Sequence, residues 1–441
     1  MISKLSLGEK LRQVRKHKEL SLANVAHDTK LSESTIGRIE RGEDVGGTPT
    51  PEQLVAIKKA LGIPNAPLLD YEVETYESRL WYVLELLHGE RYQEAKDIIQ
   101  DLAVILELPF EGDLSAILLL LHARLLMLES DGGTIPEEAI KKIDKVDTYI
   151  AEAGYHIRDE VLYWFHFNKC RYYLTQVDYK KALEHGLKIL DYGRTGQRTD
   201  AAVWRNIGTA YYYCGQLFHA SKYFEQAVSV ATRDTPSGQN SLLKLTLATC
   251  YIHTRELDKA QKLLEEAHAL ATSTNNKWYI SIALLELGKI SHIRGNYDDA
   301  IALYDQALAG QKECNATFYV QGLLYKGVTL IRKKQLTECE KLINEGRDII
   351  SIHKENIYAY DTMLIYFTNL QHRANLKDRN SVDYLENVAI PYYRKTGPKF
   401  EALEICRELE EHYKKQRSKM KELTVVAVMR DILLETMYGE V

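Results

Sequence analysis

The chain is poor in proline and cysteine. Only 9 prolines occur in 441 residues, and this scarcity favours helices over loops and sheets. The 6 cysteines form no C-x-x-C pair and have no clustered histidine partner, so the spacing that a metal site or a catalytic thiol needs is lacking. We therefore expect small, buried, reduced cysteines, with no metal and no cofactor.

The sequence also lacks a long apolar run. The most hydrophobic segment, residues 114–128, is interrupted by His122 and Arg124, and Lys4 and Glu9 interrupt any apolar run near the start. Signatures of phosphate-binding loops, zinc proteases, serine hydrolases and paired catalytic carboxylates are missing as well. These absences predict a cytoplasmic protein with no membrane partner and no enzymatic activity.

Charge is distributed unevenly along the chain, whose formal net charge is -5. Residues 1–65 contain 11 Lys+Arg and 8 Asp+Glu, a local charge of +3, which leaves -8 for the remainder. A modestly basic head on an acidic body is compatible with phosphate binding at the head only. The length exceeds what one hydrophobic core usually serves, so we expect several domains or a repeat array.

Residues 32–42, SESTIGRIERG, have the pattern of a short helix with one apolar and one polar face. The first serine can cap the helix, and Ile36 and Ile39 share the face that docks into a small core. Upstream, a second serine-capped helix covers residues 22–28, and residues 29–31 form the turn between the two. This arrangement predicts a helix-turn-helix.

The polar face of the second helix suits a DNA groove. An arginine fork binds guanine O6 and N7 together, serine and threonine bind phosphate or base edges, and glutamate accepts from the cytosine amino group. The alternative is a stable helical bundle whose polar face only meets solvent. The candidate DNA-binding residues are Ser32, Glu33, Ser34, Thr35 and Arg38.

Residues 5–63 resemble the Xre/Cro-type, lambda-repressor-like helix-turn-helix family, with LGEKLRQVRKHKELSLANVAHDTKLSESTIGRIERG as the core of the match. The resemblance places Glu33, Ser34 and Arg38 where the family reads bases, and the other two candidates where it holds phosphate.

The same resemblance implies an ion pair inside the head. Arg15 and Glu40 occupy positions where the family often has a partly buried pair that braces the first helix against the recognition helix. Leu22 departs from the family, since many members carry at this place a glutamine that supports a base or phosphate contact. The affinity of the recognition helix for DNA is therefore expected to be weaker.

Beyond residue 66 the sequence repeats itself. Residues 201–231, 241–271 and 281–310 align with a period of 40, and a central alanine recurs at the same point of each unit. Each unit has a small residue late in its first helix and a large apolar residue four positions after the central alanine, so that bulk fits the notch. The alanines are Ala220, Ala260 and Ala300, the small residues Cys170, Gly208, Ala248, Gly288 and Gly327, and the large ones Phe224, Leu264 and Tyr304.

This pattern resembles the tetratricopeptide repeat (TPR), and residues 204–227 match its signature best. HEAT-like helix pairs share the period of about 40 but not the W-x-x-x-G-x-x-Y and G-x-x-x-x-A marks. The expected fold is all-α. It comprises a helix-turn-helix domain over residues 1–66, a linker over 67–71, a right-handed TPR α-solenoid over 72–397 with C-terminal capping or dimerisation helices over 398–441, and about eight or nine helix pairs in all.

Two consecutive units carry an asparagine two residues before the small residue, Asn168 and Asn206. Asparagine is unfavourable inside a helix, and its carboxamide can hold the backbone of an extended peptide. The alternative is that both side chains are solvated or bond a neighbouring helix. By repeat position, the same concave groove is expected to include Arg171, Arg205, Thr209, Tyr212, Thr249, His253, Leu285 and Lys289.

The whole layout is similar to the peptide-pheromone receptors of Gram-positive bacteria, the RRNPP family (Rap, Rgg, NprR, PlcR and PrgX), and is closest to the NprR-type regulators. The resemblance implies an imported short signalling peptide in the concave groove. Asn168 and Asn206 would clamp its backbone, and Arg171, Arg205 and Lys289 would meet its carboxylate.

The resemblance also implies the function of a quorum-sensing transcriptional regulator. It would bind an inverted-repeat operator in double-stranded DNA as a homodimer or higher homo-oligomer, with half-sites roughly 34 Å apart, and the peptide would switch it. Two alternatives stay open. One is a TPR interaction switch that binds a response regulator in a phosphatase-like role, and the other is a repressor with no peptide ligand.

Overall fold

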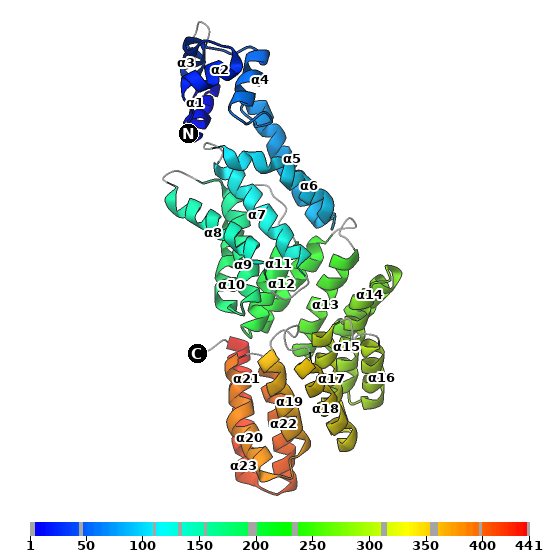
Figure 1. Ribbon diagram of the computed structural model, residues 1–441. Helices are drawn as coiled ribbons and strands as arrows, with labels where there is room; N and C mark the ends of the chain where they lie inside the picture. The colour runs from blue at the N-terminus through cyan, green and yellow to red at the C-terminus, as the bar shows by residue number, and fades with distance from the viewer. Residues whose placement is uncertain are drawn as a thin grey trace. The chain divides into compact units, whose positions relative to one another are not determined.

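The computed structural model describes ten stretches of the chain, and all their regular elements are helices. This confirms the predicted all-α class. None of the helices in these stretches is both long and apolar enough to cross a membrane. The stretches are residues 5–43, 47–108, 112–130, 135–153, 157–192, 201–231, 237–309, 315–352, 360–396 and 399–438 (Figure 1).

The chain divides into two compact units. The first comprises residues 1–175 and 188–197, and the second comprises residues 176–187 and 198–441. Helix α10 (Tyr179–Tyr192) is shared between them.

Four short helices form the N-terminal part of the first unit, and each begins at a side chain that accepts a hydrogen bond from the backbone N–H three residues on. A left-handed Lys30, with φ 59°, ends α2, and Gly42, with φ 63°, ends α3. The predicted helix-turn-helix is confirmed, because the capping residues Ser21 and Ser32 fall where the sequence places them. The helices are α1 (Leu7–His17), α2 (Leu22–Thr29), α3 (Glu33–Arg41) and α4 (Pro51–Ala60).

The rest of the first unit begins with a segment whose first residues, 67–69, are packed against the head. Leu68 is 1% exposed and belongs to the same hydrophobic cluster as Ile36 and Leu108. Lys10 Nζ donates to the Leu68 carbonyl at 3.0 Å. The leucine therefore belongs to the head core, and the linker over residues 67–71 stays a prediction. The following helices are α5 (Asp70–His88), α6 (Tyr92–Leu102), η1 (Ala103–Glu107), α7 (Gly112–Glu129), α8 (Glu137–Glu152) and α9 (Asp159–Thr175).

The second unit is a stack of antiparallel helix pairs. Its pairs begin with α11 (Ala201–Tyr213) and α12 (Leu217–Val230), α13 (Ser237–His253) and α14 (Leu257–Ser273), α15 (Lys277–Ile293) and α16 (Tyr297–Leu308), and α17 (Ala316–Arg332) and α18 (Leu336–Ile352). They continue with α19 (Tyr360–Ala374), α20 (Arg379–Tyr384), η2 (Leu385–Ala389), α21 (Ile390–Thr396), α22 (Lys399–Lys415) and α23 (Lys419–Tyr438). The described helices that contact their successor as a pair are α5 with α6, α7 with α8, α11 with α12, α13 with α14, α15 with α16, α17 with α18 and α22 with α23.

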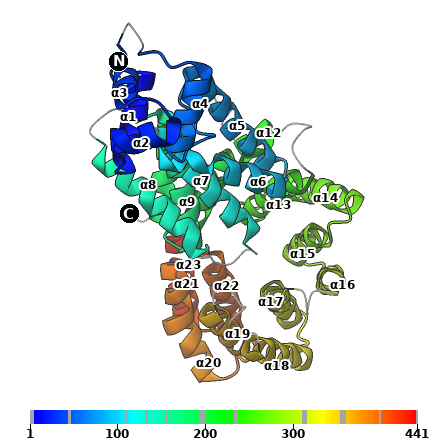
Figure 2. The same ribbon diagram turned by 45° about the horizontal axis from the view of Figure 1, so that its top comes forward.

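Within the second unit, the first helices of the pairs follow an arc. Figure 2 shows α13, α15, α17 and α19 along this arc, with α14, α16 and α18 on its outer side. The first helix of each pair therefore faces the inner side, as the TPR pattern predicts. We call this side the inner face.

Glycines in the first helices leave room for the bulky side chains of the second helices. A Cβ on Gly208 would lie 2.6 Å from the Phe224 ring, and a Cβ on Gly288 would lie 2.5 Å from the Tyr304 ring. Both aromatic rings are almost fully buried. The predicted fit of bulk into a notch is confirmed in both repeats.

The C-terminal helices α22 and α23 cap the stack. Leu409, Val425 and Ile432 are buried in a cluster that also contains Leu385 and Tyr393, and α23 contacts α12. The predicted pair of C-terminal helices is therefore present, and one of its faces is covered by the preceding helices.

The described cysteines behave as small apolar side chains. Cys170, Cys250, Cys339 and Cys406 are buried free thiols, and Cys214 is half-buried. Burial raises the pKa of the Cys170 thiol to about 12 and that of Cys339 to about 11. The sixth cysteine lies outside the described residues, which contain no group of three His, Cys, Asp or Glu side chains that could hold a metal ion.

Candidate functional site

Helix α3 presents the five candidate DNA-binding residues at its N-terminal end and along its polar face. Ser32, Glu33 and Ser34 are exposed, and Thr35 and Arg38 are half-buried. Ser32 Oγ accepts from the Thr35 backbone N–H at 3.0 Å and lies 2.8 Å from Thr35 Oγ1. Arg38 Nε finds no acceptor among the described residues. These side chains are available to a partner, and their role in DNA binding stays a prediction.

An ion pair braces α1 against α3. Arg15 Nε and Nη2 donate to the two carboxylate oxygens of Glu40 at 2.6 and 2.8 Å, and Arg15 Nη1 donates to the Leu20 carbonyl at 2.9 Å. The hydrogen bonding of Arg15 to the Glu40 carboxylate is the main cause that raises the pKa of Arg15. The two side chains are only 12% and 7% exposed. This confirms the pair that the family resemblance implies.

The backbones of the same two helices also touch. A Cβ added to Gly8 would lie 2.2 Å from the Ile39 carbonyl oxygen, so only glycine permits this approach. Leu22, at the position of the family glutamine, is half-buried and packs against the head core. The position of α3 is therefore fixed by the close backbone contact and the ion pair with α1 and by apolar packing in the head core.

In the second unit, two side chains that stand two residues before a helix glycine have buried polar atoms with no hydrogen-bond partner among the described residues. Asn206 is 3% exposed, and its Nδ2 finds no acceptor among the described residues. Glu286, two residues before Gly288, is 6% exposed, and its Oε2 finds no donor in the described part of the chain. A buried donor or acceptor without a partner costs about 1–3 kcal/mol. Such atoms need an explanation, and a bound ligand would supply one.

Lys289 lies beside Glu286, and its ammonium group already has partners within the protein. Its Nζ donates to Glu286 Oε1 at 2.7 Å and lies 3.9 Å from the centre of the Tyr325 ring. Burial lowers the pKa of Lys289, but the charge of Glu286 and the Tyr325 hydroxyl outweigh burial and raise it. The lysine is charged, but Glu286 already neutralises it, so a peptide carboxylate would compete with an internal one.

Tyr212 and His253 form the neighbouring part of the inner face. Their rings lie 5.6 Å apart. Burial, and then the positive charges of Lys289 and Arg255, lower the pKa of His253 to about 3, so the imidazole is neutral at pH 7. Burial also raises the pKa of the Tyr212 hydroxyl well above its ordinary value. This part of the inner face is aromatic and uncharged.

Three further predicted residues mainly serve the repeats themselves. Thr209 Oγ1 donates to the Arg205 carbonyl at 2.8 Å, and Thr249 Oγ1 donates to the Leu245 carbonyl at 3.0 Å. Leu285 is 3% exposed and belongs to the core. Apolar packing between repeats accounts for the burial of Leu285, and its role in the groove stays a prediction. Arg205 is half-buried, with Nη2 3.5 Å from the carboxamide oxygen of the adjacent asparagine.

Asn168 and Arg171 belong to the first unit. Asn168 is fully buried, and its Nδ2 donates to the Trp164 carbonyl at 2.9 Å and to the Leu120 carbonyl at 3.2 Å. Arg171 Nη2 donates to the Met127 carbonyl at 3.3 Å. Asn168 thus bonds a neighbouring helix, as the alternative interpretation of the asparagines describes, although its Oδ1 has no donor among the described residues.

Glu286 and Tyr325 also lie beside Lys289 on the inner face, and neither is among the residues predicted from the sequence. Each stands two residues before a small residue, Gly288 and Gly327, as Asn206 does before Gly208. The shared repeat position therefore identifies both residues, whereas asparagine as a residue type does not.

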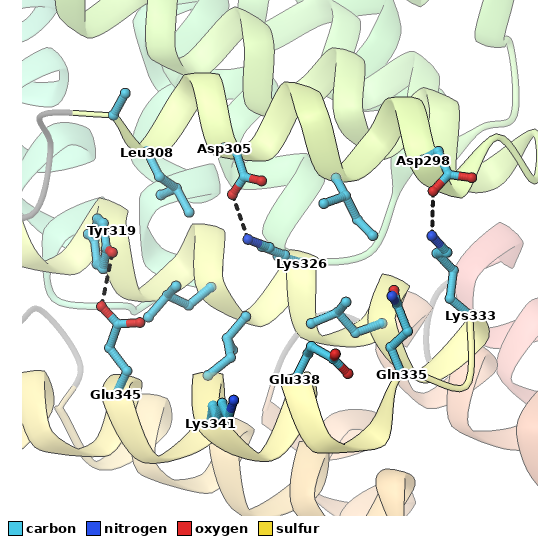
Figure 3. Close-up of a pocket in the computed structure, with 15 residues that line it drawn as sticks. Asp298, Asp305, Leu308, Tyr319, Lys326, Lys333, Gln335, Glu338, Lys341 and Glu345 are labelled. Carbon is cyan, nitrogen blue, oxygen red and sulfur yellow. Dashed lines mark hydrogen bonds and ion pairs between the residues drawn. The ribbon is translucent and has the colours of Figure 1, made fainter.

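A groove of about 570 Å³ lies on the outer side, between α16, α17 and α18 (Figure 3). Its charged walls are paired across the groove. Lys326 bonds Asp305 at 2.5 Å, and Lys333 bonds Asp298. None of the residues predicted to bind peptide lines this groove, so the inner face is the better candidate site.

Two models of known families match the chain. A helix-turn-helix domain matches residues 6–70, and a tetratricopeptide repeat matches residues 239–313. The chain therefore carries a helix-turn-helix domain and tetratricopeptide repeats. A comparison with curated proteins gave no match. The helix-turn-helix model ends close to the predicted boundary of the head, and the repeat model covers the region from α13 to α16.

Several solved structures share the fold. A Rap protein complexed with Competence and Sporulation Factor is 15% identical, with a TM-score of 0.67, and the match covers 83% of this chain and 99% of that one. The apo quorum sensor NprR from B. thuringiensis is 18% identical, with a TM-score of 0.61 over 82% and 99% of the two chains. NprR in complex with its cognate peptide NprX gives 18% and 0.61 over 81% and 98%. The chain therefore shares the overall fold of these proteins.

Proposed function

We propose that this chain is a quorum-sensing transcriptional regulator, which binds DNA through α3 and is switched by a short signalling peptide on the inner face of its repeats. The observation that carries the proposal is the pair of buried, unsatisfied polar atoms at equivalent repeat positions, Asn206 Nδ2 and Glu286 Oε2. NprR, a solved structure with this fold, is in complex with its cognate peptide NprX, which supports a peptide as the missing partner.

Asn206 and Glu286 could together bind the backbone of an extended peptide. Asn206 Nδ2 would donate to a peptide carbonyl, and Glu286 Oε2 would accept from a peptide N–H or an ammonium group. Packed helices lie 8–10 Å apart, so two repeats separate these atoms by roughly 16–20 Å. An extended chain covers roughly 3.3 Å per residue, which corresponds to a peptide of about six residues. Tyr212 and His253 would offer apolar rings between the two polar ends.

The head would bind DNA as part of a dimer. Arg38 would read a guanine edge, Glu33 and Ser34 would contact other base edges, and Ser32 and Thr35 would hold phosphate. Two heads with α3 in successive major grooves, roughly 34 Å apart, require an inverted repeat. The peptide would change the population of arrangements in which both heads fit the operator.

Peptide selection tests the groove directly. The full chain is incubated with a synthetic library of six-residue peptides, and retained peptides are identified by mass spectrometry. We expect Asn206→Ala to lower the affinity of the retained peptide at least tenfold, because one hydrogen bond and the peptide register are lost. Asn387→Ala is the matched control, because this exposed asparagine bonds only its own helical turn. Equal affinities in all three proteins would remove Asn206 from the site.

DNA selection from random duplexes tests the head. We expect Arg38→Ala to lose discrimination at one guanine, worth about 1–3 kcal/mol, whereas Lys59→Ala, an exposed residue of α4, keeps the selected sequence. An unchanged sequence preference in Arg38→Ala would exclude base reading by Arg38.

A further inference from the structure

One face of α22 carries a row of glutamates that meets arginines from three different repeats. The glutamates are spaced by three, four and three residues, which places them on one side of the helix. The arginines stand at or just after the C-terminal ends of α13, α17 and α19, which are first helices of their pairs. The glutamates are Glu401, Glu404, Glu408 and Glu411, and the arginines are Arg255, Arg332 and Arg373.

The contact with α19 is a permanent anchor. Arg373 Nε and Nη2 donate to the two oxygens of Glu408, both at 2.8 Å, and each side chain is only 4% exposed. Glu401 lies 3.6 Å from the same guanidinium. Removing either partner of Arg373–Glu408 would leave a buried charge without compensation, so this contact does not open at low cost.

The contact with α13 is different in kind. Arg255 Nη2 donates to Glu404 Oε1 through a single hydrogen bond of 3.1 Å, and the side chains are 44% and 24% exposed. Arg332 Nη2 lies 3.6 Å from the same carboxylate, and the same guanidinium lies 4.0 Å from Glu408 and bonds Glu411 at 3.0 Å. Arg407 of α22 itself also donates to Glu404 Oε1 at 2.5 Å. An exposed ion pair of this kind is weak and is screened by salt. Helix α22 is therefore held strongly to α19 and only weakly to the end of α13.

The weak contact joins distant parts of the second unit. Arg255 and Glu404 are 149 residues apart in sequence, and Figure 2 shows α22 on the inner side of the arc. Glu401 on this helix is close enough to the inner row for the charge of Lys289 to act on it, although burial is the main cause that raises the pKa of Glu401. Helix α22 therefore borders the side chains assigned above to peptide binding.

We infer that α22 is a releasable strap across the inner face, held permanently at Arg373–Glu408 and closed or opened at Arg255–Glu404. This inference rests on the proposed function, since it assigns the strap to regulation of the peptide site. The closed strap restricts access to Asn206 and Glu286 on the inner face, and the open strap lets an extended peptide enter. Loss of one exposed ion pair changes the ratio of open to closed strap by roughly two- to fivefold.

The first test measures opening without any ligand. Lys262, exposed on α14, and Ala427, exposed on α23, are each replaced by a ketone-bearing residue that carries a spin label. The distance between the two labels in the full chain reports the separation of the arc from the capping helices. We expect Glu404→Gln and Arg255→Gln each to enlarge the long-distance population by roughly two- to fivefold. Glu410→Gln is the matched control, because Glu410 lies on the same helix and pairs with Lys414 of that helix. Identical distance distributions in Glu404→Gln and Glu410→Gln would overturn the strap.

The second test links opening to the peptide site. The same proteins are incubated with the library of six-residue peptides, and the retained amount is measured. We expect Glu404→Gln to retain roughly two- to fivefold more peptide than wild type and Glu410→Gln to match wild type. An open strap with unchanged retention would overturn the gating role. A wild-type chain and variants that retain no peptide would instead overturn the proposed function and gating together, while the distance measurement still decides the strap itself.

Discussion

The ion pair between Arg15 and Glu40 predicts how firmly the recognition helix is held. Glu40→Ala removes the carboxylate that accepts two hydrogen bonds from Arg15, at 2.6 and 2.8 Å. The guanidinium, 12% exposed, is then left against the head core with only the Leu20 carbonyl as a described acceptor. We expect α1 and α3 to separate more often, because the charge that joined them has lost its partner.

The cost follows from burial. Removing one partner of a buried pair costs about 3–5 kcal/mol, and the remaining bond to Leu20 and partial solvent access of Arg15 lower this to about 2 kcal/mol. Since 1.36 kcal/mol corresponds to a factor of ten, amide exchange in α1 and α3 should become roughly 30-fold faster. The two helices should respond together, whereas the C-terminal repeats should not.

Hydrogen exchange followed by mass spectrometry on the full chain measures this change. Glu43→Ala is the control, because its pair with Arg41 has the same 2.6 Å distance but side chains 56% and 42% exposed, so its loss costs at most about 1 kcal/mol. Glu40→Met combined with Arg15→Met should recover much of the protection, since no buried charge remains. Equal exchange of α1 and α3 in Glu40→Ala and Glu43→Ala would refute the reasoning.

Two further perturbations test the repeats. Gly288→Ala should destabilise the chain by about 1–3 kcal/mol, because the new Cβ would lie 2.5 Å from the Tyr304 ring. Gly89→Ala is the control, because its new Cβ would meet no atom closer than 3.4 Å. Equal urea midpoints of the two variants would contradict the fit of Tyr304 against Gly288. His253 has a folded pKa of about 3 against an ordinary 6.5, so below pH 6.5 the unfolded chain binds a proton that the folded chain excludes. Stability should therefore fall as the pH drops from 7 to 5, by up to about 2 kcal/mol, and His253→Gln should flatten this decline more than the exposed His219→Gln; parallel pH profiles would exclude His253 as the cause.

Local chemistry explains why much of the fold could be predicted. The start of α3 depends on one serine and the N–H groups of its own first turn, so Ser32 identifies it without tertiary information. The contact of Gly288 with Tyr304 lies within one helix pair, and its spacing therefore recurs in the sequence. The Arg15–Glu40 pair came from family resemblance, because no local pattern joins residues 25 positions apart.

The site could be predicted only in part, because neighbouring elements decide which atoms of a helix are available. Asn168 and Asn206 occupy the same repeat position, yet Asn168 Nδ2 bonds two carbonyls and Asn206 Nδ2 bonds none in the described chain. Leu285 is buried by the following repeat, which a single unit does not reveal. The contact of Arg255 with Glu404 spans 149 residues, so no repeat pattern could have pointed to it.

The proposed function requires that a peptide on the inner face controls DNA binding by α3. Fluorescence anisotropy of the selected operator duplex, titrated with the chain in the presence and absence of the selected six-residue peptide, tests it most directly. We predict that the peptide shifts the operator affinity of wild type at least fivefold and leaves that of Asn206→Ala unchanged at the same peptide concentration. An operator affinity that ignores the peptide in wild type, or that shifts equally in both proteins, would contradict the account.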